Sequence, residues 1–278
     1  TRSAVDTSSA SQHLASPPNP DAELLSTQLE LHNQKEGSAT GFEWYGVIPT
    51  SVTIAGSNDT GHWTWAADFS TSGIPGRAVT ADFSGLVQPA RVPFFWGKTF
   101  LKVATTLPGA APTISGTSLP TSSFDPDGGW TVTDWSAQVL SYSYNWSTNI
   151  YRNYTGSETG SASDAWRDKI TQTITLTHLM DATNPLGNLV SGGHGINAAG
   201  EQLTYGMLMG NRQNELVGST YYFSLSQYFP KCELLSVTPA RGNPRVFSST
   251  WLVCDPSASG VKSSYSYSYN ASTEGDYF

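Results

Sequence analysis

The sequence predicts an all-β protein, and three observations support that prediction. Ser and Thr make up about a quarter of the 278 residues, which is more than usual. Aromatic residues reach 12%, whereas charged residues are only 13%. Residues 170–178 alternate strictly, with Ile170, Ile174 and Leu176 on one face and threonines on the other. β-Branched and aromatic side chains suit a half-buried pleated surface, and a period of two indicates a strand.

Turn residues divide the chain after Gly41 into segments of this kind. Glycine, proline and asparagine separate them at intervals that are typical of a sandwich or a barrel. Residues 134–139 and 163–168 are each a candidate for one helical turn. The expected strands are residues 42–54, 62–69, 78–87, 94–106, 131–146, 170–179, 201–209, 220–228, 232–237, 246–254 and 264–269.

Residues 1–40 differ from the rest and are predicted to form an N-terminal arm, followed by one β domain over residues 41–278. Residues 1–20 are rich in Ser, Ala and Pro without a hydrophobic period, as in an extended segment. Residues 24–31 then favour either a short amphipathic helix or a strand. Because the chain begins with Thr, we expect that an upstream segment was removed.

Charge and composition exclude several classes of protein. The formal net charge of −8 argues against a dedicated nucleic-acid binder, which needs a basic patch. Apolar runs are too short to span a bilayer. Cys232 and Cys254 are expected to be buried thiols, with a single disulfide as the alternative. The five histidines lack the spacing of metal ligands, so we predict neither a metal nor a cofactor.

Catalytic motifs are weak in this sequence. Residues 192–195 (Gly-Gly-His-Gly) are the most site-like segment, but they are also typical of a flexible loop tip. Glu43 and Asp68 each lie near a tryptophan, and two such carboxylates can line the sugar cleft of a glycoside hydrolase. We favour a protein that is not an enzyme and assign no catalytic residue.

Two aromatic segments allow a binding role or a structural one. Tyr142, Tyr144 and Trp146 alternate with Ser and Asn, which fits a sugar platform or, as we favour, the buried face of a strand. Tyr265, Tyr267 and Tyr269 alternate with serine in a similar segment near the C-terminus. As an edge strand, it would offer a docking surface to another chain.

One segment resembles a known family. Residues 86–103 (Leu-Val-Gln-Pro-Ala-Arg-Val-Pro-Phe-Phe-Trp-Gly-Lys-Thr-Phe-Leu-Lys-Val) are similar to a stretch in capsid proteins of picorna-like RNA viruses. There, a proline-containing approach leads into an aromatic-Trp-Gly turn and a long strand. In this chain Lys98 follows the glycine rather than preceding it. The resemblance implies an eight-stranded antiparallel jelly-roll sandwich with an extended N-terminal arm. Asp68 and Asp82 each precede phenylalanine without a preceding acid, so the family's maturation role is not assigned to them.

These observations predict a structural capsid subunit that assembles an icosahedral shell around an RNA genome in the virion. Its expected partners are other capsid subunits, with a host receptor or glycan contacted through loops such as residues 107–129. Contact with RNA is expected to be weak or indirect, and no membrane span is expected. One alternative is a secreted β-sandwich lectin or a pore-forming toxin that inserts residues 170–179. A glycoside hydrolase is the third hypothesis.

Overall fold

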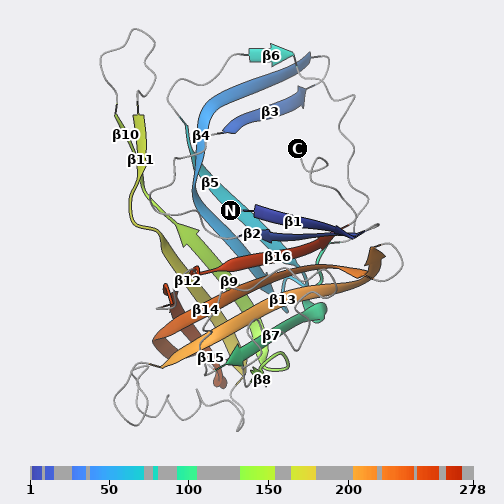
Figure 1. The fold of residues 1–278 in the computed structure, drawn as a ribbon, viewed down its shortest axis with the longest axis vertical. Helices are drawn as coiled ribbons and strands as arrows, with labels where there is room; N and C mark the ends of the chain where they lie inside the picture. Colours follow the sequence, from blue (N-terminus) through green and yellow to red (C-terminus); the bar gives the residue numbers. More distant parts are fainter. Residues whose placement is uncertain are drawn as a thin grey trace.

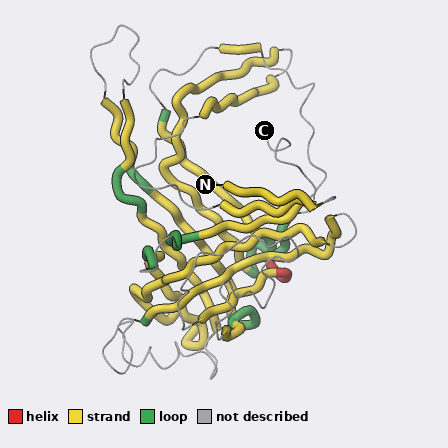
Figure 2. The backbone as a smooth tube through the Cα atoms, in the orientation of Figure 1, coloured by secondary structure: helices red, strands yellow, loops and turns green. Residues whose placement is uncertain are grey.

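A computed structural model describes residues 2–7, 10–15, 27–35, 38–71, 78–80, 93–104, 132–153, 164–179, 203–217, 221–240, 243–256 and 261–270. Within these ranges the regular structure is strand, apart from one short 3-10 helix (Figures 1 and 2). The all-β prediction is therefore confirmed. In chain order the elements are β1 (Arg2–Thr7), β2 (Ala10–Ala15), β3 (Thr27–Lys35), β4 (Ser38–Ser57), β5 (Trp63–Ser70), β6 (Ala78–Thr80), η1 (Trp96–Lys98), β7 (Thr99–Ala104), β8 (Val132–Asp134), β9 (Val139–Ser147), β10 (Ile150–Asn153), β11 (Asp164–Arg167), β12 (Thr171–Leu179), β13 (Thr204–Val217), β14 (Tyr221–Ala240), β15 (Asn243–Val253) and β16 (Tyr265–Asn270).

Fourteen of the described strands form one antiparallel sheet, while β10 and β11 form a separate hairpin. Around the main core the strand order is β5-β4-β9-β12-β15-β14-β13-β7. The two ends of this order meet, because His62 bridges Phe95 and the Trp63 N–H donates to the Phe94 carbonyl over 2.8 Å. In Figure 1, β13, β14 and β16 run across β4, β5 and β9. The sheet thus folds over on itself into two packed, sandwich-like layers.

The strand order contains two Greek keys. β9 lies beside β4, which continues to β5 and then to β7 across the His62–Phe95 bridge, and β12 lies beside β15, followed by β14 and β13. In the first set the last strand in the chain, β9, lies next to the first, β4, and in the second set the first strand, β12, lies next to the last, β15. A jelly roll also pairs the first strand of the sandwich with the last, and the pairings of the described strands do not include β4 with β15. The eight-stranded jelly-roll order is therefore not confirmed, although the antiparallel sandwich character is.

The core lies between the two layers and is rich in aromatic side chains. Trp135 and Trp251 are fully buried, and the ring of Tyr205 packs against both, with centroids 5.7 and 5.6 Å away. The Tyr142 hydroxyl donates to Gln227 Oε1 over 2.6 Å and so links β9 to β14 on the facing layer. Aromatic burial supplies most of the apolar contact area here, and the hydroxyl finds a partner, as buried tyrosines usually do.

Several predicted segments need correction. The expected strand over residues 131–146 is two strands, β8 and β9, separated by a turn rather than by the helical turn expected at 134–139. The expected strands over 220–228 and 232–237 merge, since Tyr221–Ala240 is the continuous strand β14. Residues 163–168 are not helical, since Asp164–Arg167 is the strand β11. In β11 and β14, tertiary pairing overrides the weak local preference for a turn.

Part of the N-terminal segment is also strand. β1 and β2 pair as a hairpin, and β2 pairs with β16, so the polar residues 2–15 extend the sheet at its edge. Residues 27–35 form β3, which pairs with the first half of β4, so the strand alternative holds there rather than the helix. No helix in the described part of the chain is long and apolar enough to cross a membrane.

Candidate functional site

The carboxylates proposed for glycoside hydrolysis lie on neighbouring strands but are offset along them. Asp68 of β5 is opposite Ser51 of β4, whose hydroxyl donates to its Oδ2 over 2.5 Å. Glu43 lies eight residues before Ser51 on β4, where it pairs with Glu30 of β3. Eight residues of straight strand would correspond to about 26 Å, although β4 contains Gly46 at φ 60°, whereas paired catalytic carboxyls stand roughly 5 to 9.5 Å apart. The register of β4 therefore gives no support for Glu43 and Asp68 flanking one glycosidic bond.

The histidines do not converge on a metal site. His13, His32, His62 and His178 lie on different elements, and no group of three metal-ligating side chains forms among the described residues. His178 of β12 is buried. Desolvation lowers its pKa to about 4, and its ring stacks on Phe247. The glycine-rich segment around His194 lies outside the described residues, as do residues 107–129.

Both cysteines are free thiols. Cys232 is buried in the core, and burial raises the pKa of its thiol well above the ordinary value. Cys254 directly follows the neighbouring strand β15 and is half-buried, and its backbone N–H donates to the Lys231 carbonyl over 2.9 Å. The structure therefore has no disulfide between Cys232 and Cys254, and that alternative is wrong.

The aromatic alternation of β9 belongs to the core. Tyr142 and Tyr144 are buried and Trp146 packs against them, so the predicted sugar platform on this strand is absent and the favoured core interpretation is confirmed. Burial raises the pKa of Tyr144 to about 12, which keeps its hydroxyl protonated as it donates to Gln172 Oε1. The tyrosine strand β16 is not an edge, because β14 and β2 pair with its two sides.

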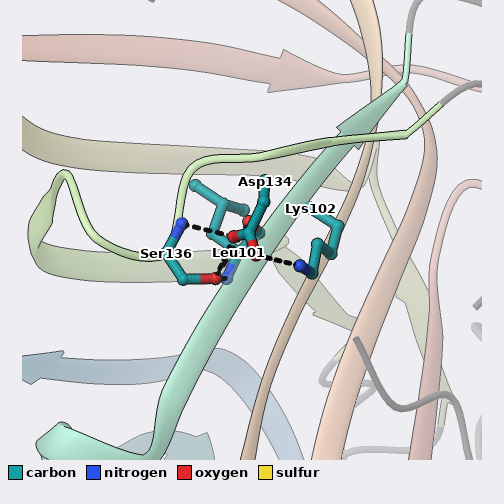
Figure 3. Close-up of polar contacts among 4 residues, drawn as sticks. All are labelled: Leu101, Lys102, Asp134 and Ser136. Atoms are coloured by element: carbon teal, nitrogen blue, oxygen red, sulfur yellow. Dashed lines mark hydrogen bonds and ion pairs between the residues drawn. The ribbon is translucent and has the colours of Figure 1, made fainter. Parts of the chain in front are cut away.

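A polar cluster joins the β8–β9 turn to β7. Lys102 forms an ion pair with Asp134, and the Ser136 N–H and hydroxyl both donate to Asp134 Oδ1 (Figure 3). Partial burial alone would raise the pKa of Asp134, but the hydrogen bonds from Lys102 and Ser136 outweigh it and lower that pKa. Ser136 Oγ also accepts the Leu101 N–H over 3.0 Å.

This cluster is structural rather than nucleophilic. The Ser136 hydroxyl proton is directed to the Asp134 carboxylate, whose lowered pKa and ion pair with Lys102 make it a poor general base. The contacts instead hold the turn that buries Trp135, whose backbone N–H donates to the Leu101 carbonyl over 2.9 Å.

Exposed aromatic side chains gather on β5. Trp63 faces the core, and Trp65, Ala67 and Phe69 follow on the same side of the strand because side chains alternate. Trp65 is 76% exposed and Phe69 is 44% exposed. β4 pairs with one edge of β5, and beyond the His62–Phe95 bridge no described strand pairs with the other. We refer to Trp65, Ala67 and Phe69 with this unpaired backbone as the aromatic edge.

A second pair of exposed aromatics lies on the β10–β11 hairpin. We call this hairpin the arm, and it is distinct from the predicted N-terminal arm of residues 1–40. In Figure 1 the arm projects away from the packed layers. Tyr151 and Trp166 are directly opposite each other, with ring centroids 6.0 Å apart and planes inclined by 23°. Their side chains are 47% and 50% exposed. The sequence analysis missed the arm, because each strand has only four residues.

Known proteins do not identify either surface. No protein-family model matches the chain, and no curated protein matches it. The family resemblance of residues 86–103 is therefore neither supported nor contradicted by these comparisons. Locally, the segment forms the turn η1, with Trp96 buried, and then leads into the six-residue strand β7.

Proposed function

We propose that this chain is a structural capsid subunit, which assembles with other capsid subunits into an icosahedral shell around an RNA genome. The observation that supports this best is the aromatic edge. A large apolar surface beside unpaired backbone donors and acceptors is a template for strand addition by another chain.

The composition of β5 strengthens this argument. Proteins that remain monomeric protect their edge strands with lysine, proline, bulges or inward-pointing charges. β5 reads Trp-Thr-Trp-Ala-Ala-Asp-Phe-Ser, and its one charged residue, Asp68, points away from the aromatic side. Trp65 continues the apolar row formed by Ile54, Tyr144 and Ile174 out to the edge. A neighbouring subunit placed here would extend the existing core.

A capsid subunit also needs a rigid scaffold, which the two aromatic-filled layers provide. The expected jelly-roll order is part of this proposal, but assembly through the aromatic edge depends on the sandwich and its free edge rather than on that order. The net charge of −8 supports only weak or indirect contact with RNA, because little phosphate can be neutralised.

The pore-forming alternative is less well supported. β12, the strand that it would insert, pairs along its length with β9 and β15 and buries Ile174 and Leu176 in the core. Releasing it would break two ladders and expose the core. The lectin alternative has better support, from the exposed Tyr151 and Trp166 side chains of the arm.

Negative-stain microscopy and native mass spectrometry of the full chain test the proposal. We expect shells or large oligomers from the wild type, and dissociated subunits from the double variant Trp65→Ser, Phe69→Ser. Leu235→Ser is the matched control, since Leu235 is a 51% exposed apolar residue on β14. Near-UV circular dichroism checks that each variant folds. A homogeneous wild-type monomer, or a folded double variant that assembles normally, would refute the proposal.

A further inference from the structure

The two strands of the arm share one five-residue pattern. Residues 149–153 are Asn-Ile-Tyr-Arg-Asn, and residues 164–168 are Asp-Ala-Trp-Arg-Asp. Both have an amide or acid at each end, an aromatic in the centre, and an apolar residue and an arginine between them. Antiparallel pairing aligns the two segments, with Tyr151 opposite Trp166 at the midpoint.

Alternation along each strand sends the arginines toward the packed layers. Arg152 donates to the Gly46 carbonyl over 2.8 Å and to the Ser70 carbonyl over 3.0 Å, and so ties the arm to β4 and β5. The guanidinium of Arg167 lies over the Trp146 ring, 5.8 Å from its centroid. These contacts stabilise a two-stranded hairpin that would be marginal alone in water.

The opposite face of the arm carries the other three positions of each pattern. Register places Asn153 opposite Asp164 and Tyr151 opposite Trp166. Asn149 and Asp168 continue the ladder, since the Asp168 N–H donates to the Asn149 carbonyl over 2.9 Å. An aromatic rung is thus flanked on both sides by a rung that pairs an asparagine with an aspartate.

The polar rung of Asn149 and Asp168 is held in place beside the aromatic rung of Tyr151 and Trp166. The Tyr151 hydroxyl lies 3.4 Å from Asp168 Oδ2 and donates to it. The backbone N–H of Lys169, together with side-chain hydrogen bonds from Asn149 and Tyr151, lowers the pKa of Asp168 below its ordinary value. Asp168 is therefore an ionised acceptor at neutral pH, fixed at the border of the exposed rings.

We propose that this face of the arm binds a neutral oligosaccharide. The exposed faces of Tyr151 and Trp166 would pack against the apolar face of a sugar ring. The carboxylates and amides on either side would accept and donate hydrogen bonds to the hydroxyls at its rim. The inference is independent of the proposed assembly function, because it concerns the arm and not the aromatic edge.

The dimensions and charge of the surface favour a sugar over a protein. From residue 149 to residue 153 the strand extends about 13 Å, and two paired strands are about 10 Å wide, so this face covers roughly 130 Å². That area is a small fraction of the roughly 800 Å² that each partner buries in a stable protein interface. The ionised Asp168 beside the rings disfavours sialylated or sulfated glycans, since like charges repel. A short neutral glycan therefore suits the surface best.

An immobilised array of neutral, sialylated and sulfated oligosaccharides tests this inference on the full chain. Production in bacteria avoids attachment of a glycan at Asn153, which begins an Asn-Tyr-Thr sequon. We expect selective binding of neutral members. The best of them is then titrated in solution, and Trp166→Ala should weaken its binding tenfold or more, while Trp166→Phe should keep most of it. Asp168→Asn should weaken binding by a smaller factor.

Trp65→Ala is the matched control, because it removes an exposed tryptophan from β5 and should leave glycan binding unchanged. Native mass spectrometry of the same variants separates the two proposals, since Trp166→Ala should assemble as the wild type does. Absence of binding to neutral glycans, or binding that Trp166→Ala leaves intact, would overturn the inference. Loss of assembly in Trp166→Ala without any glycan binding would instead make the arm a protein contact.

Discussion

The outward faces of the two layers differ sharply, although both layers enclose the same core. On β4, β9, β12 and β15 the outward residues form a hydroxyl face, in which half-buried Ala55, Ser143, Thr175 and Thr250 make one rung. On β7, β13, β14 and β16 they form a covered face. One rung of that face contains Lys102, Leu208, Tyr228 and Tyr265, all of which are buried.

The comparison shows what a layer requires of its strands. A layer with one wet face needs strict alternation, which β12 has, with Ile174 and Leu176 inside and threonines outside. A layer buried on both faces needs apolar residues at consecutive positions. β13 has them, because Met207 and Met209 face the core while Leu208 lies on the covered face.

The largest expected effect contrasts a residue from each face. Leu208→Ala should destabilise the protein by about 3 kcal/mol, because it removes buried methyl groups and leaves a cavity. Thr175→Ala, on the hydroxyl face, should change stability by less than about 0.5 kcal/mol. Urea denaturation followed by tryptophan fluorescence measures both. Equal effects would mean that the two outward faces are equivalent.

The contrast between the faces also explains which parts of the fold were predictable. The inner face and the threonine face of β12 follow from its alternation alone. The run of apolar residues at 205, 207, 208 and 209 signals burial on both faces, yet it names no neighbour. Alternation tells which way a side chain points, but pairing partners depend on contacts distant in sequence. For this reason the tyrosine segment of β16 could be considered as an edge strand from its sequence, whereas β14 and β2 enclose it.

The candidate surfaces were less predictable than the fold. The sequence shows that Trp65 lies near Asp68, which is compatible with a sugar cleft. The exposure of Trp65 on an unpaired edge depends on the strand order, which the sequence does not show. The repeated patterns at 149–153 and 164–168 are visible in the sequence. Their significance appears only when antiparallel pairing brings Tyr151 and Trp166 onto one rung, since each pattern alone has ordinary composition.

A second prediction concerns how closely the strands of the covered face approach. An added Cβ at Gly210 of β13 would lie 2.4 Å from Phe100 Cζ and 2.6 Å from Ser226 Oγ. Gly210→Ala should therefore destabilise the protein by about 2 kcal/mol through overpacking. Gly97→Ala is the control, because a Cβ there meets nothing within 4 Å. Thermal unfolding of the two variants compares them, and a neutral Gly210→Ala would mean that the covered face is loosely packed.

The smallest expected effect tests whether water is excluded from the core side of the layer formed by β4, β9, β12 and β15, as it is from the covered face. His178 is buried there, and desolvation lowers its folded-state pKa to about 4, against 6.5 for an unperturbed histidine. The unfolded state thus binds more protons between these values, so stability is present above pH 6.5 and falls as the pH drops toward 4. At pH 5.5 the loss attributable to His178 should be about 1 kcal/mol. Carboxylates also titrate in this range, so the measurement is the difference in unfolding free energy between the wild type and His178→Gln at pH 8 and at pH 5.5. If the difference between the wild type and His178→Gln is the same at both pH values, solvent reaches His178. The layer that carries the hydroxyl face would then be exposed to water on both of its faces near His178.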